Sequence, residues 1–137
     1  MRAVPERCYS VVTDFERYPE WASDIKSVHV LDRDDQGRAT SVGFRAAAFG
    51  RSTSYTLAYD YASAPGKLSW VQTSGDITTR LDGAYVFEPV GEEETEVVYH
   101  LVAELRVPIP GFVKRRAEGR IMGTALRNLR ARVESGV

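Results

Sequence analysis

The chain has 137 residues, enough for one domain with a substantial core, and a net charge of -1, which gives no general attraction to nucleic acid or to an anionic membrane. No apolar run approaches the ~20 residues of a membrane span, and residues 1–10 lack the apolar core of a signal peptide. The single cysteine, Cys8, leaves no internal disulfide. We therefore expect one cytoplasmic domain over residues 1–137, with no integral membrane segment and no nucleic-acid partner.

The N-terminal segment predicts a helix, a break and a second short helix. Pro5 fits a first helical turn, and Glu6 lies near the positive end of the helix dipole. Apolar residues recur at helical spacing at Val4, Cys8, Val11, Val12 and Phe15. Cys8 is therefore interpreted as a small buried residue. Pro19 disfavours helical backbone at Tyr18, so the second helix is expected to begin near Pro19.

From residue 25 the hydrophobic period changes from helical to two, which predicts an antiparallel meander. The expected strands occupy residues 25–33, 38–50, 51–63, 67–74, 78–90 and 95–107. Turn residues such as "DDQG", "APG" and "GEEE" separate them.

The last element is a long amphipathic helix over residues 112–136. Its apolar stripe is Val113, Ala117, Ile121, Ala125, Leu129 and Val133, with Met122 and Leu126 beside it. Its arginines fall elsewhere and are interpreted as a solvated face. A long helix laid across a curved antiparallel sheet is an α+β architecture, and this arrangement tends to leave a ligand cavity between the two layers.

The sequence offers no catalytic motif. It contains no glycine-rich phosphate loop, no nucleophile elbow and no cluster of Cys or His for zinc. His29 and His100 lie in separate strands and are interpreted as structural or solvated. The acidic stretch "GEEETE" is interpreted as a solvated hairpin turn. No metal, cofactor or catalytic residue is predicted.

The positive signal is aromatic. Tyrosines recur on the apolar strand faces, and a buried hydroxyl without a partner costs ~1–3 kcal/mol, so several inward hydroxyls favour a partly polar cavity over a plain core. The alternative is that each hydroxyl reaches water at a sheet edge. The candidate ligand contacts are Trp21, Phe44, Tyr55, Tyr59, Trp70, Gln72, Tyr85, Tyr99, Ile121 and Ala125. Phe44 and Arg45 point to opposite faces, and the sequence does not decide which one faces inward.

Four segments carry a family resemblance. They are similar to segments of the START-like, helix-grip superfamily, in particular its bacterial polyketide cyclase/dehydrase and coenzyme-Q-binding branches, and read "VPERCYSVVTDFERYPEWASDIKSVHVL", "LDGAYVFEP", "TEVVYHLVAEL" and "VPIPGFVKRRAEG". The resemblance implies a sheet wrapped around the C-terminal helix and a lipid, polyketide or quinone type of ligand. It also implies that the N-terminal short helices close one end of the cavity, with Phe15 and Trp21 plugging the opening and Tyr18 a less certain member.

The N-terminus departs from this family. Family members have a strand before the first helix, whereas only "MRAV" precedes Pro5, so the first family strand is expected to be missing or truncated. Its loss would leave residues 95–107 as an exposed edge, and such edges pair with other chains. We therefore expect either a homodimer through this edge or poor behaviour in solution.

Three functions remain open at this point. The first is non-catalytic binding of a small hydrophobic molecule. The second is a polyketide aromatase/cyclase, in which Tyr59, Gln72, Tyr85 and Arg45 could orient a poly-keto chain and move protons. The third is a protein-interaction module like the ribosome-associated toxins of the coenzyme-Q-binding branch.

Overall fold

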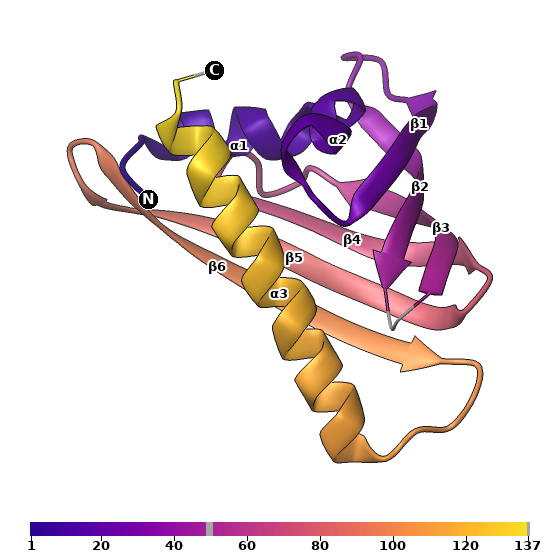
Figure 1. Cartoon of the computed structure of the whole chain (residues 1–137). Helices are drawn as coiled ribbons and strands as arrows, with labels where there is room; N and C mark the ends of the chain where they lie inside the picture. The colour runs from indigo at the N-terminus through magenta and orange to yellow at the C-terminus, as the bar shows by residue number, and fades with distance from the viewer. Residues whose placement is uncertain (49–50, 137) are drawn as a thin grey trace.

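A curved, six-stranded antiparallel sheet and one long helix make up most of the chain (Figure 1). The computed structural model describes residues 1–48 and 51–136. The strands follow one another in chain order across the sheet, each hydrogen-bonded to the next. The elements are α1 (Pro5–Thr13), the 3-10 turn η1 (Phe15–Arg17), α2 (Tyr18–Trp21), β1 (Ile25–Arg33), β2 (Ala39–Ala48), β3 (Arg51–Asp60), β4 (Lys67–Gly75), β5 (Thr78–Gly91), β6 (Glu94–Leu105) and α3 (Gly111–Glu134).

This architecture confirms the predicted α+β, helix-grip fold. Helix α3 crosses one face of the sheet, and the short N-terminal helices cover one end of the molecule (Figure 1). Strand boundaries agree with the sequence periods to within a few residues. Residues 49 and 50, expected at the end of the second strand, lie outside the described residues. The prediction missed η1, the single turn that joins α1 to α2. It was also wrong about Tyr18, which has helical backbone (φ -51°, ψ -42°) and begins α2 although Pro19 follows it.

One part of the buried core lies where α1 and the C-terminal half of α3 meet the sheet. Cys8, Val12 and Leu129 are fully buried there. The complete burial of Cys8 confirms its interpretation as a small buried residue, and this burial raises the pKa of its thiol. Burying side chains of this size stabilises the fold by about 1.5–3 kcal/mol for each valine or leucine.

Strand β6 forms one edge of the sheet. The described residues contain no strand before α1, but Met1 still exchanges two backbone hydrogen bonds with Thr95, at 2.7 and 2.9 Å. Further along the same edge, Glu118 of α3 accepts a hydrogen bond from the Ala103 N–H at 2.8 Å. Outward backbone groups alternate along an antiparallel strand, so the open part of the edge lies between these two residues.

The N-terminal end of α3 corrects one expectation. Val113, placed on the apolar stripe, is 41% exposed, whereas Leu129 and Val133 on the same stripe are buried. The apolar stripe is continuous along α3, but the first turns of the helix extend beyond β6, where the sheet no longer covers them (Figure 1). A helix buries only the length that the opposing layer covers.

Candidate ligand cavity

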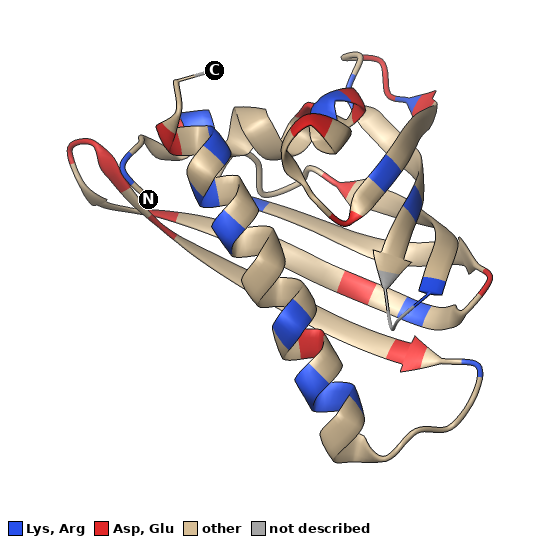
Figure 2. Cartoon of the chain, viewed as in Figure 1, with Lys and Arg blue, Asp and Glu red and all other residues tan. Residues whose placement is uncertain are grey.

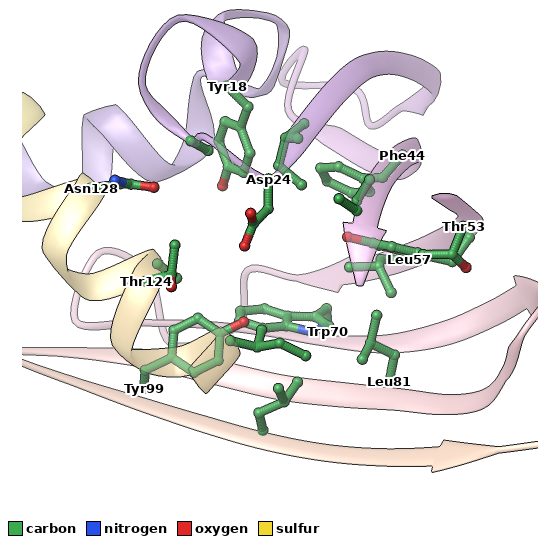
Figure 3. A pocket seen from close by; sticks show the side chains of 18 of the residues that line it. Tyr18, Asp24, Phe44, Thr53, Leu57, Trp70, Leu81, Tyr99, Thr124 and Asn128 are labelled. Atoms are coloured by element: carbon green, nitrogen blue, oxygen red, sulfur yellow. The ribbon is translucent and has the colours of Figure 1, made fainter. Parts of the chain in front are cut away.

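A cavity of about 120 Å³ lies between α3, the α2–β1 connection and the inner face of the sheet (Figure 3). Nine of the ten predicted ligand contacts line it. They are Trp21, Phe44, Tyr55, Tyr59, Trp70, Tyr85, Tyr99, Ile121 and Ala125. Ligand contact by these residues stays a prediction, but their position around one space follows from the fold.

Strand alternation brings these side chains together. Tyr55, Leu57 and Tyr59 occupy alternate positions of β3, so all three point to the same face and line the cavity. Phe44 of β2 is paired with Tyr55 and is 5% exposed. On the helix side, Ile121, Ala125 and Asn128 are spaced four and three residues apart and so share one face of α3.

The aromatic residues form a continuous wall. Ring centroids are 5.8 Å apart for Tyr59 and Trp70, 5.5 Å for Trp70 and Tyr85, and 4.6 Å for Tyr85 and Tyr99. Such pairs contribute about 0.5–1.5 kcal/mol each beyond burial of their area. The cavity wall is therefore held in place without a ligand.

Four tyrosine hydroxyls on this wall have no protein partner among the described residues. They belong to Tyr55, Tyr59, Tyr85 and Tyr99. Since every fully buried polar side-chain atom in the described part of the chain has a partner, these hydroxyls are accessible from the cavity. Burial is the main cause that raises the pKa values of these four hydroxyls far above neutral pH. For Tyr55, Tyr59 and Tyr85, repulsion from neighbouring tyrosines is the second cause. They remain protonated and offer neutral hydrogen bonds.

The opening of the cavity carries polar groups that the sequence interpretation missed. Asp24, Thr124 and Asn128 line the cavity (Figure 3), and they lie on its open side, since Asp24 is exposed and the other two are half-buried. The Asn128 side-chain oxygen accepts hydrogen bonds from the Ser23 N–H at 3.0 Å and from its hydroxyl at 2.9 Å, which ties α3 to the α2–β1 connection. The sequence gives one signal for Asp24 as a lining residue, since it comes at the end of the aromatic segment that begins with Phe15. No local pattern identifies Thr124 and Asn128 on α3 as lining residues.

Two proposed polar contacts lie elsewhere. The Gln72 carboxamide does not line the cavity, because it accepts a hydrogen bond from the Thr78 hydroxyl at 2.5 Å and donates one to the Thr78 carbonyl at 2.7 Å. Arg45 is exposed on the outer face, since Phe44 takes the inward position. Neither residue can act on a molecule in the cavity without rearrangement.

Of the residues expected to plug the cavity, Phe15 takes a different position. Trp21 and Tyr18 line the cavity, whereas Phe15 lies outside the lining, is 2% exposed and packs on Tyr59 with ring centroids 4.5 Å apart. The Tyr18 hydroxyl donates to the Val12 carbonyl, so it is satisfied within the protein. The aromatic segment therefore combines one core residue with two that shape the end of the cavity.

Other kinds of site find little support in the described part of the chain. No three His, Cys, Asp or Glu side chains of residues 1–48 and 51–136 gather as they would around a metal ion. None of the described helices is both long enough and apolar enough to cross a bilayer. His29 and His100 are both exposed, in agreement with their interpretation as solvated.

Comparisons with known proteins agree with this arrangement. The family profile described as "Polyketide cyclase / dehydrase and lipid transport" matches residues 1–130. A START superfamily protein from Mycobacterium smegmatis is 27% identical, with a TM-score of 0.95 over 100% of this chain and 94% of that one. A protein from Thermus thermophilus is 26% identical, with a TM-score of 0.80 over 99% and 93% of the two chains. The Zhui aromatase/cyclase from a Streptomyces species is 15% identical and shares the fold, with a TM-score of 0.83 over 97% of this chain and 88% of that one. No curated protein sequence matches the chain.

Proposed function

Because the chain belongs to the polyketide cyclase/dehydrase and lipid-transport family, we propose that it binds a small, uncharged and largely apolar molecule in the cavity under α3. The observation that carries this proposal is an aromatic cavity in which four tyrosine hydroxyls, those of Tyr55, Tyr59, Tyr85 and Tyr99, lack partners among the described residues. A plain core would leave no such groups, because unpaired polar atoms in an apolar interior cost ~1–3 kcal/mol each.

The size of the cavity limits the ligand. It holds about 120 Å³. An apolar cavity of ~150 Å³ accommodates benzene, whereas pockets for drug-sized ligands measure ~300–1,000 Å³. One ring, or one end of a larger molecule that extends out of the opening, fits this space.

The charges around the cavity favour an uncharged ligand. Among the described lining residues there is no Lys, Arg or His to pair with an anion, and Asp24 would repel one at the opening. The protonated hydroxyls of Tyr59, Tyr85 and Tyr99 can bond a carbonyl or phenol oxygen. A ring that bears one such oxygen satisfies both the apolar wall and the hydroxyls.

A matched pair of probes tests this proposal. Isothermal titration at neutral pH with 1-naphthol and with 1-naphthoate compares a neutral and an anionic ligand of similar shape, each with one ring for the cavity and one that extends out of the opening. We expect 1-naphthol to bind and 1-naphthoate to bind roughly tenfold more weakly or not at all, because its charge would be buried without a partner. Equal binding of the two probes would overturn the proposed selectivity.

One pair of variants localises the site, and one further measurement looks for a naturally bound ligand. Ala125→Phe places a ring in the cavity and should abolish 1-naphthol binding, whereas Ala131→Phe, at an exposed position of the same helix, should not. Native mass spectrometry of the purified protein, repeated after organic extraction, would identify any apolar molecule that copurifies. Unchanged binding by Ala125→Phe would move the site elsewhere.

A second candidate function is an aromatase/cyclase-type reaction, which the partnerless tyrosine hydroxyls also favour. With raised pKa values these groups can donate to keto oxygens but cannot accept a proton at neutral pH. Asp24 is the carboxylate among the described lining residues, so it would have to be the base. Incubation with a poly-β-ketone should then give a cyclised product, and Asp24→Asn should abolish it. Binding of 1-naphthol without such turnover would favour the non-catalytic function.

We also propose that the chain pairs with a second copy of itself through the open part of β6. Thr95 and Ala103 already have partners on this edge, so pairing would use the backbone groups of Val97, Tyr99 and Leu101. This surface is shorter than the sequence suggested, and the association should be correspondingly weak.

A further inference from the structure

The connection from β6 into α3 ends in an exposed apolar tip, formed by Val107, Phe112 and Val113. These side chains are 64, 63 and 41% exposed. Phe112 lies in the first turn of α3, which has no acidic residue and no side-chain cap. Three apolar side chains close to one another in the chain and all open to solvent are typical of an interaction surface.

Cations flank this apolar tip on the solvent face of α3. Phe112, Arg116 and Arg120 are four residues apart and therefore share one face of the helix. Arg115 is also exposed, and none of these three arginines forms an ion pair with a described residue. The N-terminal end of the helix dipole adds to the positive potential.

The nearby acids are already engaged. Glu118 turns toward the sheet and accepts the Ala103 N–H at 2.8 Å. Glu104 lies 3.8 Å from Arg80. Most of the exposed acidic charge at this edge of the sheet is at the opposite end, in the hairpin between β5 and β6 (Figure 2). Although the net charge of the chain is -1, the surface around the tip is therefore locally basic.

We propose that the apolar tip and its flanking arginines dock the protein onto the surface of an anionic lipid bilayer. Two attractions hold peripheral proteins on such surfaces. Apolar side chains insert at the level of the headgroups, and arginines pair with lipid phosphates. An acidic protein partner would explain the arginines but would not call for a projecting phenylalanine beside them. This inference stands without the proposed ligand, because it uses only the outer surface of the chain.

The apolar tip and the cavity share one helix, α3. Phe112 and Ile121 are nine residues apart on α3, about 13 Å along the helix axis. Ile121 lines the cavity. The same helix would thus contact the bilayer with its first turns and a ligand with its middle.

Co-sedimentation with lipid vesicles tests the proposal. The full chain should pellet with vesicles of phosphatidylcholine mixed with phosphatidylglycerol, should not pellet with phosphatidylcholine alone, and should be released by added salt. Arg115→Gln combined with Arg116→Gln should weaken the partition roughly thirtyfold, since each basic residue near such a surface contributes about 1 kcal/mol. Phe112→Ser should weaken it roughly tenfold through lost apolar contact.

Matched variants elsewhere provide the controls. Leu31→Ser removes an apolar side chain of nearly equal exposure, 61%, on β1, and Arg17→Gln combined with Arg33→Gln removes the same charge from another face. Both controls should bind vesicles as the parent chain does. Equal binding to neutral vesicles, no binding to anionic ones, or the same loss in the controls would overturn the proposal. So would a dimer in lipid-free solution that Phe112→Ser abolishes, because the tip would then be covered by a second copy.

Discussion

Trp70 of β4 and Gly83 of β5 are paired in the sheet, and the ring of Trp70 occupies the space where a side chain at residue 83 would begin. A Cβ at residue 83 would lie 2.6 Å from Cζ2 of Trp70 and 2.5 Å from the carbonyl oxygen of His100. The glycine therefore allows the tryptophan to lie against the floor of the cavity.

Replacement of this glycine should destabilise the protein. Gly83→Ala would force Trp70 and the β6 backbone apart, and overpacking of this kind costs about 1–3 kcal/mol. Urea unfolding followed by tryptophan fluorescence measures the change in the free energy of unfolding. Gly119→Ala is the control, because nothing lies within 4 Å of its added Cβ in α3, and it should stabilise the helix by about 1 kcal/mol. A neutral Gly83→Ala would show that the sheet adapts at this point.

The cavity tyrosines should contribute to ligand affinity. Tyr85→Phe and Tyr99→Phe each remove a hydroxyl that has no partner among the described residues, so the free energy of unfolding should change little. Each should weaken 1-naphthol binding by a factor of roughly 2–10, the value of one hydrogen bond. Tyr61→Phe is the matched control, since its hydroxyl donates to the Ala39 carbonyl at 2.6 Å outside the cavity. It should cost about 1 kcal/mol of stability and leave the affinity unchanged.

Stability should fall steeply at alkaline pH. Burial is the main cause that raises the pKa of all seven tyrosines, to about 12 for Tyr61. Unfolded tyrosines titrate near ~10, so above that pH the folded state binds more protons than the unfolded state. The free energy of unfolding should therefore be insensitive to these groups below pH ~10 and decrease as pH rises from there toward the folded pKa values.

Ultraviolet absorbance of tyrosinate, recorded together with urea unfolding across this range, checks the expectation. Tyrosinate should appear with unfolding, and Tyr85→Phe should lose stability less steeply than the parent chain. Full ionisation of the tyrosines near pH ~10 in a protein that remains folded would contradict the raised pKa values of these side chains.

The open edge of β6 should control self-association. Glu118→Ala leaves the Ala103 N–H without its partner and lengthens the open edge, so the proportion of dimer should increase. Light scattering coupled to size-exclusion chromatography over a range of concentrations measures this proportion. Glu104→Ala, on the same strand but paired only with an exposed arginine, should have no effect. Strict monomers in every sample would exclude pairing through β6.

The elements and their faces could be predicted from the sequence because short-range patterns control them. Period-two alternation placed Tyr55 and Tyr59 on one face of a strand, and the second helix begins within one residue of Pro19, near where it was expected. These are local consequences of backbone geometry, and the structure confirms them.

The polar part of the cavity was harder to predict, because hydrogen-bond partners come from distant segments. Gln72 follows the inward face of its strand, yet Thr78 of the next strand takes its carboxamide. Asn128 reaches the opening only because α3 crosses the sheet beside Ser23, a residue far away in the chain. No pattern within either segment contains this information.

The sequence by itself determined the fold class, the inward aromatic faces and the amphipathic character of the last helix, since each depends on the spacing of side chains along one element. Only the tertiary structure decided how much of that helix is covered. Because the first turns of α3 extend beyond the area that the sheet covers, Phe112 and Val113 are exposed to solvent. The arginines beside them form no ion pair within the described chain, so a nearly neutral protein has one end that is both basic and apolar. Composition reports the sum of the charges, whereas packing determines where each charge lies and which apolar residues are left uncovered.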